Sequence, residues 1–82
     1  MYYLRELSAD AERYLQAGNI ARLIRSLNTL IRFGKCIPEP KSLSQLELLT
    51  LAARHPNADS RMEPLVLKLA YAYGLVKHPP TE

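Results

Sequence analysis

Apolar residues recur at three- and four-residue spacing through the first part of the chain. Residues 2–17 and 20–33 each place charged side chains opposite an apolar stripe, which is typical of amphipathic helices. Gly18 supplies a left-handed helix stop and Asn19 an N-cap, so we predict an antiparallel helical hairpin with a minimal link. The apolar positions are Tyr3, Leu4, Leu7, Ala11, Tyr14 and Leu15 in the first helix, and Ile20, Leu23, Ile24, Leu27, Leu30 and Ile31 in the second.

The pattern changes after Gly34, where two prolines interrupt it. Pro38 and Pro40 lack an N–H donor and push their predecessors toward extended backbone. Residues 35–42 are therefore predicted to form a stiff connector, not a helix.

Two further helices are predicted after this connector. The third covers residues 43–54 and is opened by a capping box, formed either by Ser42 with Gln45 or by Ser44 with Glu47. Pro56 and Asn57 end it. The fourth covers residues 61–73, is opened by Ser60 with Glu63 or by Pro64 in the first turn, and stops at Gly74.

The predicted fold class is all-α. We expect a small bundle of three to four short helices, with an antiparallel N-terminal hairpin and a proline-linked C-terminal pair. A chain of 82 residues has room for one core, so residues 1–82 are predicted to be a single helical domain with a frayed tail at 77–82. The hairpin places Tyr14, Gly18, Ile20, Leu23, Leu27 and Leu30 at spacings that resemble part of a tetratricopeptide helix pair. The tryptophan and the packing alanines of that repeat are missing.

The composition indicates the class of protein and the compartment in which it is expected. An apolar content of 48% with 23% charged residues is typical of globular proteins, and no stretch is long and apolar enough for a membrane span. The first residues lack a secretory signal pattern. Cys36 is the single cysteine, so there is no internal disulfide and no site of paired thiolates. We expect a cytoplasmic protein without membrane association.

The second predicted helix carries a basic face, which we call the arginine ridge. No acidic residue occurs between positions 19 and 38, and the formal net charge of the chain is +3. The ridge is expected to contact an anionic partner, either a phosphate backbone or an acidic protein surface. The alternative is an ordinary solvated face whose arginines pair with acids of neighbouring helices. The ridge consists of Arg22, Arg25 and Arg32, extended by Lys35.

Phe33 projects to the polar side of the same helix, near Arg22 and Thr29. An exposed phenylalanine beside arginine is typical of a protein-interface anchor, so we include Phe33 among the partner-binding residues. The alternative is that the last turn bends and tucks the ring under the proline connector.

The fourth predicted helix is apolar on nearly every side, with Lys68 as its one charged interruption between residues 65 and 73. Three short helices can hardly enclose a fourth completely, so part of this surface is expected to meet another molecule. The alternative is a central core helix covered by the hairpin together with Leu75 and Val76. The residues predicted to bind a partner here are Leu65, Leu69, Tyr71 and Tyr73.

No catalytic or metal-binding pattern is present in the sequence. His55 and His78 each precede a proline, and neither has a second ligand at helical spacing. We therefore predict no cofactor, no metal and no enzymatic activity. The leading prediction is a protein–protein interaction module that binds another protein or itself as a homodimer. The alternative is a nucleic-acid-binding protein that uses the arginine ridge.

Overall fold

The computed structural model describes the backbone of residues 2–74 and the side chains from Arg5 to Gly74. This part of the chain contains four helices and no strand, which confirms the all-α fold class, and each helix end lies within one residue of its predicted position. The predicted frayed tail, residues 77–82, lies outside the described residues, as do Leu75, Val76 and His78. The helices are α1 (Tyr2–Ala17), α2 (Ile20–Arg32), α3 (Leu43–Ala53) and α4 (Met62–Ala72).

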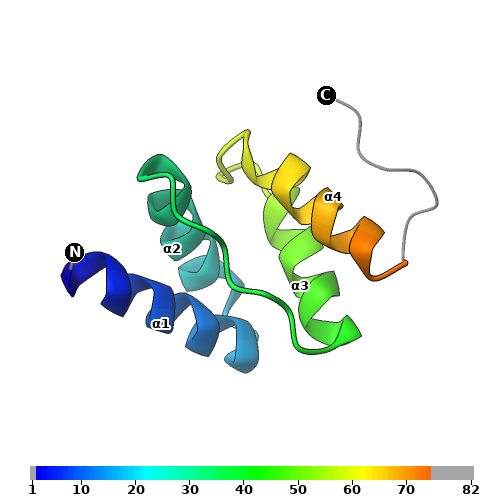
Figure 1. Ribbon diagram of the computed structural model, residues 1–82, viewed down its shortest axis with the longest axis horizontal. Helices are drawn as coiled ribbons and strands as arrows, with labels where there is room; N and C mark the ends of the chain where they lie inside the picture. The colour runs from blue at the N-terminus through cyan, green and yellow to red at the C-terminus, as the bar shows by residue number, and fades with distance from the viewer. Residues whose placement is uncertain (1, 75–82) are drawn as a thin grey trace.

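The helices form two pairs. α1 and α2 pack as the N-terminal hairpin, and α3 and α4 lie side by side as the second pair (Figure 1). The connector leaves the end of α2, runs along one face between the two pairs and enters α3 (Figure 1). The connector therefore borders both halves of the molecule.

Local signals account for three helix boundaries. Gly18 has a φ of 75°, a left-handed conformation that side chains with a Cβ disfavour, and so ends α1. The Asn19 side chain accepts a hydrogen bond from the Arg22 N–H at 3.3 Å, and the Ser42 hydroxyl accepts one from the Gln45 N–H at 3.2 Å. Each satisfies a backbone donor that the first helical turn leaves free.

Of the two signals predicted for the start of α4, Pro64 in the first turn is present and the capping box is not. The N-cap residue is Arg61, which makes no side-chain capping bond, so the capping box expected from Ser60 and Glu63 does not form. Asp59 takes over part of this role, because its Oδ1 accepts from the Arg61 N–H at 2.9 Å. Glu63 pairs instead with Arg54 at the end of α3, at 3.7 Å.

One buried cluster joins all four helices. Leu27 of α2 and Leu49 of α3 have no exposed surface, and Leu15, Met62 and Val66 are almost fully covered. The apolar stripe predicted for α2 provides the largest share of the cluster. The buried members are Ala11, Leu15, Leu23, Ile24, Leu27, Leu30, Ile31, Leu49, Ala52, Met62 and Val66.

A polar contact fixes α2 against the loop between α3 and α4. The Asn28 Nδ2 donates to the Asn57 carbonyl oxygen, and the Asn28 Oδ1 accepts from the Asp59 N–H, both at 2.8 Å. One side chain thus satisfies two backbone groups that lie 29 and 31 residues away along the chain. This contact holds the start of α4 close to α2.

Candidate functional site

Within residues 5–74, whose side chains the structure describes, α4 is covered on one side only. Met62, Val66 and Ala70 face the core and are buried. The side chains of Leu65, Leu67 and Leu69 are half-buried, and those of Tyr71 and Tyr73 are 44% and 47% exposed. Among the described residues, one side of α4 is thus covered, whereas Leu75 and Val76, which complete the cover in the alternative interpretation, lie outside them.

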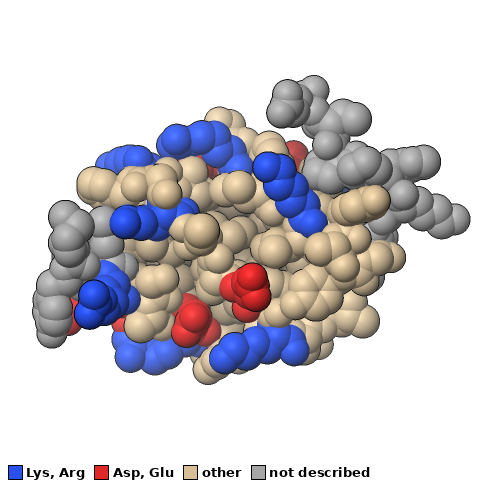
Figure 2. Space-filling model, in the orientation of Figure 1, with Lys and Arg blue, Asp and Glu red and all other residues tan. Residues whose placement is uncertain are grey.

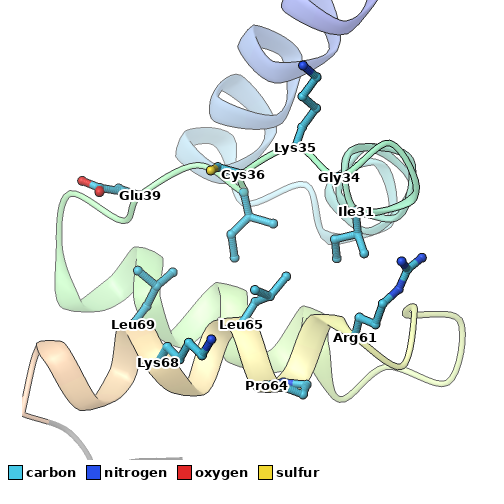
Figure 3. Close-up of a pocket in the computed structure, with 11 residues that line it drawn as sticks. Ile31, Gly34, Lys35, Cys36, Glu39, Arg61, Pro64, Leu65, Lys68 and Leu69 are labelled. Atoms are coloured by element: carbon cyan, nitrogen blue, oxygen red, sulfur yellow. The ribbon is translucent and has the colours of Figure 1, made fainter.

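A groove of about 690 Å³ runs between α4 and the connector. We call it the connector groove. Leu65 and Leu69 point into it from α4, and Ile31 points toward them from α2 (Figure 3). Ile37 of the connector also lines it. The full lining is Ile31, Gly34, Lys35, Cys36, Ile37, Glu39, Arg61, Pro64, Leu65, Lys68 and Leu69.

The charged side chains around the connector groove are mostly basic. Lys35, Arg61 and Lys68 line it, with Glu39 as the acidic member, and Glu39 points away from the gap between α4 and the connector (Figure 3). Lys68 has no ion-pair partner among the described residues. On this face of the molecule, uncharged side chains cover much of α3 and α4, and Lys and Arg as well as Asp and Glu side chains border them (Figure 2). The groove thus combines an apolar interior with a positive border.

Arg61 is held at one end of the groove by Asp59. Its Nε donates to Oδ1 and its Nη2 to Oδ2 of that carboxylate, each at 3.1 Å. These hydrogen bonds, with that from the Arg61 N–H, lower the pKa of Asp59 below its ordinary value, and they raise the pKa of Arg61. The charge of Arg32 lowers the pKa of Asp59 further. Arg61 is consequently a positioned cation, whereas Lys68 forms no ion pair with another described side chain.

The arginine ridge does not form one continuous site. Arg22 and Arg25 line a shallow depression against α1, together with Leu7, Tyr14, Ser26 and Thr29. Arg32 lies in the last turn of α2, and Lys35 belongs to the connector groove. All four residues are exposed, and none forms an ion pair with another described residue. The alternative, in which acidic residues of neighbouring helices pair with these arginines, is therefore not supported by any ion pair among the described residues.

Phe33 is 55% exposed, so the alternative in which its ring is tucked under the connector is wrong. It follows α2 directly as the C-cap residue. Leu43 and Leu51 of α3 are also exposed, at 53% and 60%. With Tyr71 and Tyr73, the described residues include five large exposed apolar side chains. All of them except Phe33 belong to the C-terminal helix pair or follow it directly.

The structure does not bring Cys36 and His55 together. Cys36 is exposed and lines the connector groove, whereas His55 lies at the end of α3, where its Nδ1 accepts from the Asn57 N–H at 3.1 Å. Among the described residues, no three His, Cys, Asp or Glu side chains are placed to hold a metal ion. None of the helices in this part of the chain has the length and apolar character of a membrane span.

Sequence reasoning identified part of each wall of the groove: Leu65 and Leu69 on α4, and Lys35 at the start of the connector. Leu65 and Leu69 were predicted as partner-binding residues from the apolar character of their helix. Ile31, Ile37 and Arg61 were not, because periodicity within one helix does not show where the connector crosses another. The available signal was Ile37, an apolar residue directly before Pro38. A comparison of this chain with protein-family models, curated proteins and solved structures gave no match.

Proposed function

We propose that this chain is a non-enzymatic protein–protein interaction module of the cytoplasm, such as a small regulator, adaptor or inhibitor. It docks on its partner through α4 and the connector groove. The observation that carries the proposal is the incomplete cover of α4, whose leucines are half-buried beside an apolar groove. A partner that covers these side chains would remove their remaining apolar surface from water.

The distribution of exposed apolar side chains supports the same face. Tyr71 and Tyr73 each combine apolar area with a hydroxyl that tolerates water at the rim of an interface. Leu43 and Leu51 add exposed apolar surface on the adjacent α3. Phe33 with the arginine ridge provides a second, charged contact surface for the same or another partner.

A different protein is favoured over a second copy of this chain. A homodimer through α4 would bring Lys68 and Lys35 of one subunit toward the same positive border on the other. Like charges at an interface oppose association unless acids compensate for them. The homodimer is therefore an outcome that the experiment must be able to detect.

Site-specific photo-cross-linking tests the proposal. A photoreactive phenylalanine analogue replaces Tyr71 on the exposed side of α4, and in a matched control it replaces Gln16, which is exposed on α1. In host cells, we expect a protein adduct from position 71 and none from position 16, with the partner identified by mass spectrometry. An adduct of twice the chain mass indicates a homodimer. Equal labelling from both positions, or none from position 71, contradicts the proposal.

Nucleic-acid binding is the second candidate function. It is favoured by the four exposed cations of the arginine ridge, which have no ion-pair partner among the described residues. Phosphate contacts by such residues would make the affinity fall steeply with salt. A gel-shift titration at increasing salt, repeated with Arg22→Glu and Arg25→Glu, decides this candidate. Binding that neither salt nor charge reversal weakens excludes the ridge.

A further inference from the structure

We propose that the connector groove binds a short segment of another protein in which apolar side chains are flanked by carboxylates. This inference rests on the proposed function, because both place a protein partner at α4. It adds the chemistry of the partner. Three features of the groove carry it: its apolar interior, its length along α4 and the sign of its charge.

The interior of the groove is built for apolar side chains. Ile31, Ile37, Leu65 and Leu69 all line it. Leu65 and Leu69 point from α4 into the gap, and Leu65 points toward Ile31 (Figure 3). Ile37, Leu65 and Leu69 are only half-buried in the free chain. Their uncovered surface provides the driving force for a partner side chain to enter, and the volume of about 690 Å³ is in the range of specific binding sites.

The length of the groove suits a helical segment. Its lining on α4 extends from Arg61 to Leu69, which corresponds to about 12 Å at 1.5 Å per residue. Anchors at positions i, i+4 and i+7 of an amphipathic helix span about 10 Å. Regular strand pairing along the connector is disfavoured, because Pro38 and Pro40 offer no N–H. Side-chain packing is therefore the mode of recognition that the groove supports.

The charge at the groove selects an acidic partner. Lys35, Arg61 and Lys68 outnumber Glu39, and Asp59 neutralises only Arg61. A carboxylate beside the apolar anchors would pair with Lys68, which has no partner among the described side chains. A nucleic acid would leave the isoleucines and leucines without partners, since the described lining residues include no aromatic ring on which a base could stack.

Selection from a random peptide library displayed on phage tests the inference with the full chain as bait. We expect the selected peptides to be enriched in leucine-type side chains and in Asp and Glu relative to the unselected library. One selected peptide, made synthetically, should then shift the amide NMR signals around Leu65 and Leu69. Selection of no peptide, of basic or uncharged peptides, or of peptides whose signals map outside the groove overturns the inference.

Two matched charge-reversal variants test whether the electrostatic contribution to peptide binding comes from the groove. Lys68→Glu is expected to weaken binding of the selected peptide about five- to tenfold, because an attraction becomes a repulsion. Lys41→Glu makes the same charge change on an exposed connector residue outside the groove, and should alter the affinity less than about twofold. Both positions are exposed, so both variants should fold, which circular dichroism verifies. Equal effects of the two substitutions contradict a groove-specific charge contact.

The two proposals fail in different ways. If position 71 cross-links a host protein but no acidic peptide is selected, the docking function stands and the groove chemistry is wrong. If position 71 yields no adduct, the proposed function fails, whatever the library contains.

Discussion

The hydroxyl of Tyr73 donates a hydrogen bond to the carbonyl oxygen of Pro40, with 2.6 Å between the two oxygens. The bond ties the end of α4 to the end of the connector, across 33 residues of sequence. Tyr73 was predicted as a partner-binding residue, and the structure gives it this internal contact as well. Because 47% of the residue stays exposed, the ring can serve both purposes.

Tyr73→Phe should lower the free energy of unfolding by about 0.5–1.5 kcal/mol, because it removes this hydrogen bond and leaves the ring in place. Tyr71→Phe is the matched control, since the Tyr71 hydroxyl has no hydrogen bond to a described residue, and its effect should be close to zero. Urea denaturation of both variants measures the difference. Equal losses would show that the bond to Pro40 contributes nothing.

Asn28→Ala should destabilise the fold by about 1–3 kcal/mol, because it leaves the Asp59 N–H and the Asn57 carbonyl without their partner. Asn57→Ala provides the comparison. Asn57 contributes backbone groups to the contacts with Asn28 and His55, so loss of its exposed side chain should cost less than about 0.5 kcal/mol. Chemical denaturation monitored by circular dichroism distinguishes the two. An Asn28→Ala variant as stable as the parent chain contradicts this account.

Leu27→Ala should cost about 2–5 kcal/mol, because the side chain is fully buried where all four helices meet and its loss leaves a cavity. The same truncation at Leu51, which is 60% exposed, should cost less than about 1 kcal/mol. In a chain this small, the first change approaches the whole stability of the fold. Thermal unfolding of both variants measures the contrast, and similar midpoints would be inconsistent with the described core.

Acid should weaken the turn before α4. The pKa of Asp59 is lowered in the folded chain, chiefly by its hydrogen bonds to Arg61, so the unfolded chain binds the proton more tightly. Its contribution to stability is complete above the ordinary pKa of 3.8 and is lost as the pH falls through the lowered folded value. Asp59→Asn should therefore flatten the dependence of stability on pH in that acidic range.

The control for this pH effect is Glu47→Gln. Glu47 is an exposed carboxylate of α3 without an ion pair to a described residue. Urea midpoints measured across the acidic range should keep their slope in this variant and lose part of it in Asp59→Asn. A slope unchanged by Asp59→Asn would show that the contact with Arg61 does not persist in solution.

The helices were predictable because their signals are local. The apolar stripe of α2 and the caps at Asn19 and Ser42 each depend on residues within one or two turns, and all of them are present in the structure. The capping box predicted at the start of α4 is absent because a contact between residues distant in sequence determines the geometry there. Ser60 fits the capping pattern, but Asp59 is fixed by Asn28 of a distant helix, so its carboxylate becomes the acceptor for the Arg61 N–H.

The candidate site was predictable only in part. The apolar excess of α4 shows in its sequence, but which side stays uncovered depends on the path of the connector. Ile37 follows Cys36 in a segment without periodicity, so nothing local places it opposite Leu65. For the arginine ridge, the sequence predicts which residues share a helix face but not what surrounds them. Helical projection places Arg22, Arg25 and Arg32 on α2, yet Arg22 and Arg25 lie beside α1 whereas Lys35 follows the helix and lines the connector groove.

The walls of the connector groove come from segments about thirty residues apart in the chain, Ile31 to Glu39 and Arg61 to Leu69. An unfolded chain cannot present them together, so any molecule that fills this space binds the native state alone. By mass action its concentration would then raise the melting temperature, by an amount that grows with the logarithm of the excess over Kd. For so small a fold, the fraction of grooves that are occupied would therefore set the melting temperature of the protein.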